Sequence, residues 1–72
     1  MQKYKNLSGK SGVVAFESGQ DYIRIKFQNS PDVYTYSYNS AGIVHVEQMK
    51  IFAVNGFGLS TYISKNVKDK YE

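Results

Sequence analysis

The chain is 72 residues long, contains no cysteine or tryptophan, and carries a formal charge of +3 at pH 7 from nine basic and six acidic side chains. This length allows one domain, and the lack of cysteine excludes a disulfide framework and thiolate metal sites. With 42% hydrophobic and 15% aromatic residues, the composition favours a folded chain over a disordered one. No apolar run resembles a signal peptide or a membrane span, so we expect a cytoplasmic protein with no membrane partner.

Residues 1–11 are predicted to form a basic N-terminal arm or a short edge strand. They place three lysines, two serines and a glycine around the single aliphatic residue Leu7, which is typical of a loosely held segment. The apolar pattern begins at Gly12, and residues 12–72 are expected to form one folded domain.

Two strands are predicted directly after the arm. Residues 12–17 and 22–28 are rich in β-branched and aromatic residues, and the second segment alternates clearly between apolar and polar side chains. The four residues between them, Ser18-Gly19-Gln20-Asp21, are typical of a turn. These segments therefore predict an antiparallel hairpin.

A ladder of tyrosines predicts the third strand. Tyr34, Tyr36 and Tyr38 recur with strict period two in residues 33–38, and successive side chains of a strand point to opposite faces. The preceding segment, Asn29-Ser30-Pro31-Asp32, is a predicted turn, because proline cannot donate to a strand ladder.

Two registers are open for these strands, and they send the tyrosine rings to opposite faces of the sheet. We favour the register that gathers the apolar side chains on one face, because covering them is worth roughly 25 cal/mol per Å². It pairs Phe27 with Tyr34, Ile25 with Tyr36, Ile23 with Tyr38, Phe16 with Ile23, and Val14 with Ile25. The core face then carries Val14, Phe16, Ile23, Ile25, Phe27 and the three tyrosines, and the outer face carries Ala15, Tyr22, Arg24, Lys26, Thr35 and Ser37. A loop one residue longer or shorter at Pro31 sets the tyrosines beside Arg24 and Lys26 instead.

Residues 41–54 are predicted to form a helix, because apolar residues recur there at steps of three and four. Asn39 or Ser40 is the expected N-cap, and Asn55-Gly56 is the expected C-cap. The β-branched residues in this segment prefer strands by intrinsic propensity, so the period and the propensity point in different directions.

A second helix is predicted from Ser60 or Thr61 to about residue 71. Its inner side would carry Ile63, Val67 and Tyr71. Phe57 and Leu59, in the linker before it, are expected to pack beneath the sheet. The predicted fold class is therefore α+β: a three-stranded antiparallel β-meander with one face covered by a C-terminal pair of helices.

Residues 12–71 resemble the KTSC family, small domains that occur as single-domain bacterial proteins and at the C-terminus of some lysyl-tRNA synthetases. The segments that carry the resemblance are Ile23-Arg24-Ile25-Lys26-Phe27, Val33-Tyr34-Thr35-Tyr36, similar to the central Tyr-x-Tyr of the family, and Tyr62-Ile63-Ser64-Lys65-Asn66-Val67-Lys68, closing on Tyr71. The chain departs from the family pattern at Ser60, Ile63 and Ser64, where a glycine, an aromatic residue and an asparagine are usual. The family has no established activity, and the resemblance implies RNA binding as its suggested role.

No pattern of residues points to catalysis, a cofactor or a metal. His45 is the only histidine and stands between two valines, and the six carboxylates are scattered, so neither shows metal-ligand spacing. Asn55-Gly56-Phe57-Gly58 contains Gly-x-Gly but lacks the preceding strand and third glycine of a dinucleotide fingerprint, so we interpret it as a helix terminator. We therefore expect a non-enzymatic binding module.

The candidate partners are RNA and a protein, the latter either another protein or a second copy of the chain. Sheet-based RNA-binding domains stack bases on exposed aromatic rings beside cationic side chains. The candidate nucleic-acid contacts are Tyr22, Arg24 and Lys26 on the outer sheet face and Lys65, Lys68 and Lys70 on the last helix. For protein interaction, the candidate surface is the uncovered sheet face with Ala15, Tyr22, Val33 and Thr35.

Overall fold

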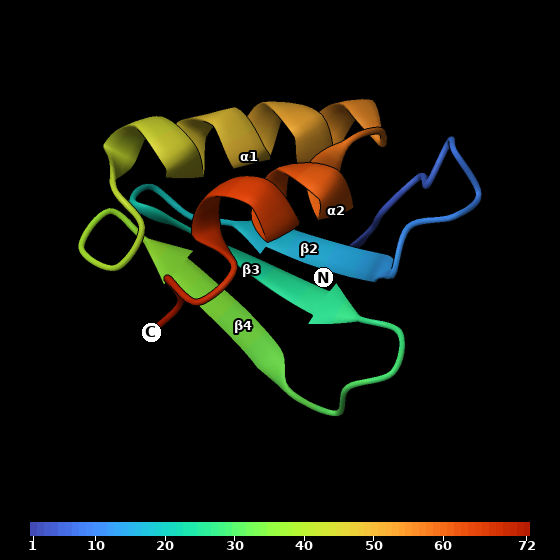
Figure 1. Cartoon of the computed structure of the whole chain (residues 1–72), viewed down its shortest axis with the longest axis horizontal. Coiled ribbons are helices and arrows are strands. Elements are labelled where there is room, and N and C mark those ends of the chain that lie inside the picture. Colours follow the sequence, from blue (N-terminus) through green and yellow to red (C-terminus); the bar gives the residue numbers. More distant parts are fainter.

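The computed structural model describes all 72 residues as an antiparallel sheet with helices packed on one face (Figure 1). The strands are β1 (Gln2–Lys3), β2 (Val13–Ser18), β3 (Tyr22–Phe27) and β4 (Val33–Ser37), arranged in chain order. They are followed by helix α1 (Ile43–Asn55), helix α2 (Leu59–Tyr62) and the π-helical turn η1 (Ile63–Val67). The predicted α+β class is confirmed. None of the helices combines the length and apolar character that crossing a membrane requires.

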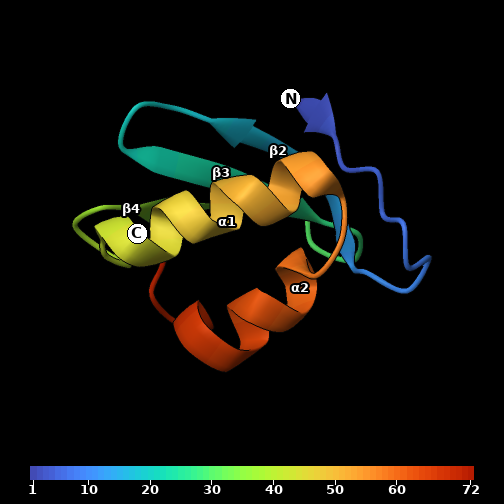
Figure 2. The same ribbon diagram turned by 90° about the horizontal axis from the view of Figure 1, so that it is seen from above.

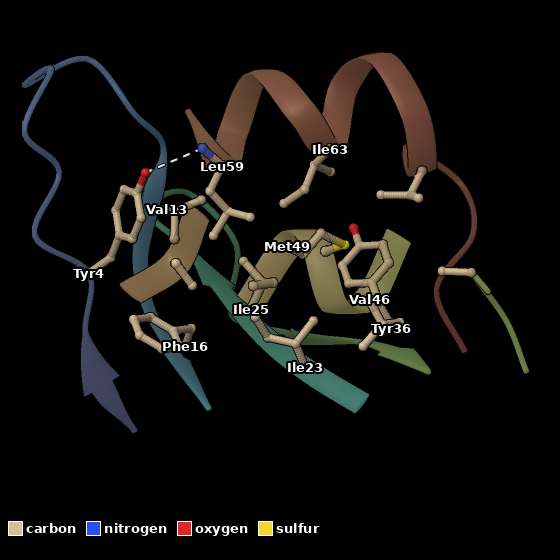
Figure 3. Close-up of a cluster of buried hydrophobic side chains, with 13 residues drawn as sticks. Tyr4, Val13, Phe16, Ile23, Ile25, Tyr36, Val46, Met49, Leu59 and Ile63 are labelled. Carbon is tan, nitrogen blue, oxygen red and sulfur yellow. Dashed lines mark hydrogen bonds between the residues drawn. The ribbon is translucent and has the colours of Figure 1, made fainter. Parts of the chain in front are cut away.

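The sheet has four strands and not the predicted three, because the arm contributes β1, the short edge strand that was one of the two predictions for residues 1–11. Gln2 pairs with Phe16 and Lys3 with Ala15. Tyr4, the next residue, is only 2% exposed, and its hydroxyl accepts a hydrogen bond from the backbone N–H of Leu59 at 3.4 Å (Figure 3). The arm is thus attached to the core by a tertiary contact. Because the arm has no periodic apolar pattern, its sequence does not predict this contact.

The strand registers are shifted by two residues from the predicted pairing, so those predicted pairs were wrong. Ile25 lies opposite Tyr34 and Ile23 opposite Tyr36, while Phe16 lies opposite Ile25. The loop between β3 and β4 is longer than expected, because Lys26 and Val33 form the last pair before it. A shift of two residues by itself keeps side chains on their predicted faces, since strand side chains alternate with period two; Val14, beside a bulge, is the exception.

The tyrosine ladder faces the helices, as the favoured register required. Tyr36 is buried in the core, and Tyr34 and Tyr38 are partly buried against it. The register that would have placed these rings beside Arg24 is therefore not the one adopted. Both tyrosines of β4, Tyr34 and Tyr36, therefore lie on the core side of the sheet.

A β-bulge in β2 reverses the predicted orientation of one valine. Val13 pairs with Phe27 and Ala15 with Lys26, so β2 has one residue, Val14, between these two pairs, and β3 has none. Val13 is consequently buried, whereas Val14, predicted on the core face, is 43% exposed. The prediction for Val14 was wrong because a bulge shifts the alternation by one position, and no Gly or Pro marks it here.

Helix α1 begins two residues later and ends one residue later than predicted. Its N-cap is Gly42, with no side-chain cap, and not Asn39 or Ser40. Ser40 instead closes the turn after β4, where its hydroxyl accepts the N–H of Ser37 at 3.0 Å. The predicted C-cap is confirmed: Gly56 has φ 76°, and its N–H donates to the carbonyl of Phe52.

The last helix ends earlier than predicted, at Val67 instead of about residue 71. The ring of Tyr71, predicted on the inner side of a helix, packs from the C-terminal tail against the ring of Tyr34, with centroids 4.8 Å apart. One residue later, the N–H of Glu72 donates to the carbonyl of Thr35 in β4 at 2.8 Å. These tertiary contacts replace the last helical turn that local propensity would support.

The core lies between the sheet and the helices (Figures 2 and 3). Helix α1 packs across β3 and β4, and α2 and η1 lie beside α1. Leu59 is fully buried as predicted, whereas Phe57 is exposed, contrary to the prediction. The buried apolar residues are Tyr4, Val13, Phe16, Ile23, Ile25, Tyr36, Ala41, Val46, Met49, Ala53, Leu59, Ile63 and Val67.

Candidate functional site

A pocket of about 480 Å³ opens between the β3–β4 hairpin and the C-terminal part of the chain. Its volume lies in the range of about 300 to 1,000 Å³ that is usual for sites of small ligands. One wall comes from the ends of β3 and β4, and the other comes from α2, η1 and the tail that follows. The pocket exists because η1 ends at Val67 and the chain then turns back toward β4.

The sheet side of the pocket is aromatic. Tyr34 and Tyr36 project from β4 on the same face because they are two residues apart, and Phe27 lies at the end of the neighbouring strand. Phe27 and Tyr34 meet edge to face with centroids 5.6 Å apart, and Tyr71 contacts both Tyr34 at 4.8 Å and Tyr36 at 6.0 Å. Such edge-to-face packing holds the rings in fixed orientations. We call Phe27, Tyr34, Tyr36 and Tyr71 the aromatic wall.

Tyr36 forms the buried end of the aromatic wall. Burial, followed by the negative charge that Tyr71, Tyr34 and Asp69 can carry, raises the pKa of its phenol to about 12. The hydroxyl therefore keeps its proton throughout the physiological range, and it can donate a hydrogen bond to an acceptor in the pocket.

The raised pKa of Tyr36 predicts a loss of stability in alkali. Between the unfolded value of 10 and the folded value of about 12, the unfolded chain releases the proton first, so the free energy of unfolding falls as the pH rises. Below pH 10 the Tyr36 hydroxyl stays protonated in both the folded and the unfolded state, so it does not change how stability depends on pH. Denaturant unfolding from pH 8 to pH 12, compared between the parent chain and Tyr36→Phe, should show a shallower decline for the variant. Identical declines would contradict the assignment to Tyr36.

The opposite side of the pocket is polar and carries one free cation. Ser60 and Ser64 line it from α2 and η1, and Lys68 and Asp69 follow from the tail. Lys68 is exposed and takes part in neither of the two ion pairs of the protein. The pocket thus combines aromatic rings, hydroxyl groups, the ammonium group of Lys68 and the carboxylate of Asp69 within one small volume.

The outer-face candidates already have partners within the protein. The Arg24 guanidinium lies 5.1 Å from the centre of the Tyr22 ring and forms an ion pair with Glu17 at 3.3 Å. The Lys26 ammonium donates to the carbonyl of Ser30. These side chains stand on the sheet face away from the helices, so a ligand there would compete with existing contacts.

The two predicted groups of nucleic-acid contacts are therefore not brought together. Of the six residues, only Lys68 lines the pocket. Lys65 and Lys70 are exposed near it in the chain, on η1 and in the tail. The remaining three, Tyr22, Arg24 and Lys26, belong to the other layer of the fold.

Sequence reasoning missed the aromatic wall as a site. It predicted that Tyr34 and Tyr36 point toward the core, which they do, but it put Tyr71 on a helix. The missing element was the return of the tail, which brings Tyr71 onto β4. The available signal was the period of two in the tyrosines of this strand, which puts Tyr34 and Tyr36, both of which line the pocket, on the same face.

Comparisons with known proteins find no match for this chain among family models, curated proteins or solved structures. The candidate site is thus defined by its own geometry.

The single histidine has a partner inside the fold. His45 Nδ1 lies 2.6 Å from the hydroxyl oxygen of Tyr62, and the two rings meet edge to face with centroids 5.7 Å apart. This contact joins α1 to α2. No group of three or more His, Cys, Asp or Glu side chains lies together in the structure.

Proposed function

We propose that the protein is a small non-enzymatic module that binds single-stranded RNA by holding an unpaired base against the aromatic wall. The observation that carries this proposal is the position of Lys68 at the rim of a pocket walled by four aromatic rings. RNA-binding domains recognise splayed bases by stacking them on aromatic side chains while cations contact the phosphates. Here the hydroxyl groups of Tyr36, Ser60 and Ser64 supply hydrogen-bonding groups for the edge of the base.

The charge distribution near the pocket supports a weak, salt-dependent contact with phosphates. Lys65, Lys68 and Lys70 lie within six residues of one another, and Asp69 and Glu72 offset part of their charge. Few cations mean few released counterions, so the affinity should be modest. The resemblance of residues 12–71 to the KTSC family, with members at the C-terminus of lysyl-tRNA synthetases, supports the same proposal. The cysteine-free sequence suits a reducing cytoplasm.

The proposal is tested by the fluorescence anisotropy of a labelled single-stranded RNA of mixed sequence. Lys68→Gln should weaken binding at low salt, because it removes a phosphate contact at the pocket. The slope of log Kd against log salt should fall by about 0.7 for this variant, the value for one phosphate contact on a single strand. Lys10→Gln, which removes the same charge from the arm, is the matched control and should leave the slope unchanged.

Two further comparisons locate the site. Tyr71→Ala removes an exposed part of the aromatic wall and should weaken binding, and the same RNA in duplex form should bind less tightly because its bases cannot enter the pocket. Flat anisotropy at low salt would rule out RNA binding. A loss caused by Arg24→Gln and not by Lys68→Gln would place the RNA on the outer sheet face instead.

A further inference from the structure

Helix α1 exposes large apolar side chains on the side away from the core. Ile43, Val44, Ile51 and Val54 are each more than half exposed, and Val44 reaches 74%. The core side of the same helix carries Val46, Met49 and Ala53. We call the four exposed residues the outer stripe.

The outer stripe is costly for an isolated domain. A helix that is apolar on all sides is usually buried on all sides, whereas a surface helix shows a polar outer face. The exposed residues are also β-branched, so they disfavour the helix by intrinsic propensity while receiving no packing in return. No contact within the chain explains them.

Two further exposed apolar side chains, Leu7 and Phe57, belong to segments at the C-terminal end of α1. Phe57 follows the C-cap residue Gly56, and the N–H of Leu7 donates to the carbonyl of Gly56 at 2.8 Å. Figure 1 shows the arm next to this end of the helix. Phe57 is 59% exposed and Leu7 68% exposed.

The charges of α1 are already satisfied within the chain. Glu47 and Lys50, the only charged residues of the helix, form an ion pair at 2.9 Å. The Glu47 carboxylate also accepts the hydroxyl of Tyr38 at 2.6 Å, and Lys50 donates to the carbonyl of Gly19 at 2.7 Å. A partner that covers the outer stripe therefore has no free charge on α1 to neutralise, and a strongly charged partner would gain nothing there.

The exposed apolar area is sufficient for a small interface. Each of these side chains hides on the order of 100 Å² when it is fully buried. The outer stripe with Leu7 and Phe57 thus presents roughly 400 Å² of apolar surface, the size of the largest apolar patch on many monomers, and such a patch is often functional. A two-fold contact that also covers Gln48 and Asn55 would bury about 1,000 Å² or more in total, where specific interfaces begin.

We infer that the outer stripe is the contact surface of a homodimer, in which α1 of one copy packs antiparallel against α1 of a second copy. Glu47, the one charged residue among the outer stripe, is already paired with Lys50, so this largely apolar face can pack against a copy of itself. A two-fold axis near Gln48 sets Val44 of one copy against Ile51 of the other. The association is independent of nucleic acid and uses neither sheet face nor the pocket.

The test is the molar mass in solution, measured without nucleic acid by sedimentation across about 10 µM to 1 mM, where small interfaces associate. The mass should rise from 8.2 kDa toward twice that value. Ile51→Lys should raise the dissociation constant at least tenfold while leaving the circular dichroism unchanged. Val33→Lys adds the same charge to an exposed valine of the outer sheet face and should leave the association intact.

A cysteine placed on the proposed axis gives a second measurement, because the chain has none of its own. Gln48→Cys should form a disulfide-linked dimer on mild oxidation, and Lys65→Cys, on η1, should do so much more slowly. A constant mass of 8.2 kDa at every concentration would overturn the proposal. So would dissociation caused by Val33→Lys and not by Ile51→Lys, since the sheet face would then be the interface.

Discussion

Replacing Tyr36 with alanine is expected to cost at least 3 kcal/mol of stability (~3–5) and to leave the domain largely unfolded. The ring is 2% exposed and belongs to the core between sheet and helices. Its removal leaves a cavity and also takes away the support of Tyr71. A chain of this size has a stability near the low end of about 5–15 kcal/mol, so this loss approaches the whole.

Urea unfolding followed by circular dichroism measures this loss. Tyr36→Phe keeps the ring and removes only the hydroxyl at the pocket, so its free energy of unfolding should stay within about 1 kcal/mol of the parent value. Tyr22→Ala removes a ring of the same size from the outer sheet face and should cost much less. If Tyr36→Ala and Tyr22→Ala cost the same, the tyrosine ladder would not be part of the core.

Replacing Tyr4 with alanine is expected to have the second largest effect, ~3 kcal/mol or more. Tyr4 is as deeply buried as Tyr36, although it lies in a segment whose composition is that of a loop. Its ring fills the space between β2 and the start of α2, and its hydroxyl accepts the N–H of Leu59. Its loss frees the arm and leaves that N–H without a partner.

Thermal unfolding of three arm variants separates these effects. Tyr4→Phe should lose only the hydrogen bond, about 1 kcal/mol, whereas Tyr4→Ala should lose the packing as well. Lys5→Ala changes the neighbouring, exposed side chain and should have little effect. A melting temperature of Tyr4→Ala equal to that of the parent would show that the arm does not contribute to the core.

Which side chains share a face of the sheet could be predicted from the sequence, because along a strand this depends only on whether residue numbers are odd or even. Tyr34, Tyr36 and Tyr38 share a face whatever the loop lengths, and burying them with Ile23 and Ile25 gathers the apolar area in one place. The pairing itself shifted by two residues, which parity cannot detect. At Val14 a bulge changed the parity locally, and the prediction failed there.

Sequence patterns allowed the short edge strand β1, but they could not predict how the arm and the tail are anchored to the core. Tyr4 and Tyr71 are single aromatic residues among lysines, and a lone residue has no period. Both are positioned by distant contacts, Tyr4 with Leu59 and Tyr71 with Tyr34. The candidate site depends on Tyr71, so the sequence predicted its cation, Lys68, but not its aromatic wall.

Each margin of the sheet is partly blocked against a further strand. On one side the last strand, β1, is only two residues long and ends in Lys3, which leaves almost no backbone to template a neighbour. On the other side the carbonyl of Thr35 is already occupied by the N–H of Glu72. A peptide ligand that adds a strand along β4 therefore has to displace the Glu72 N–H from the Thr35 carbonyl.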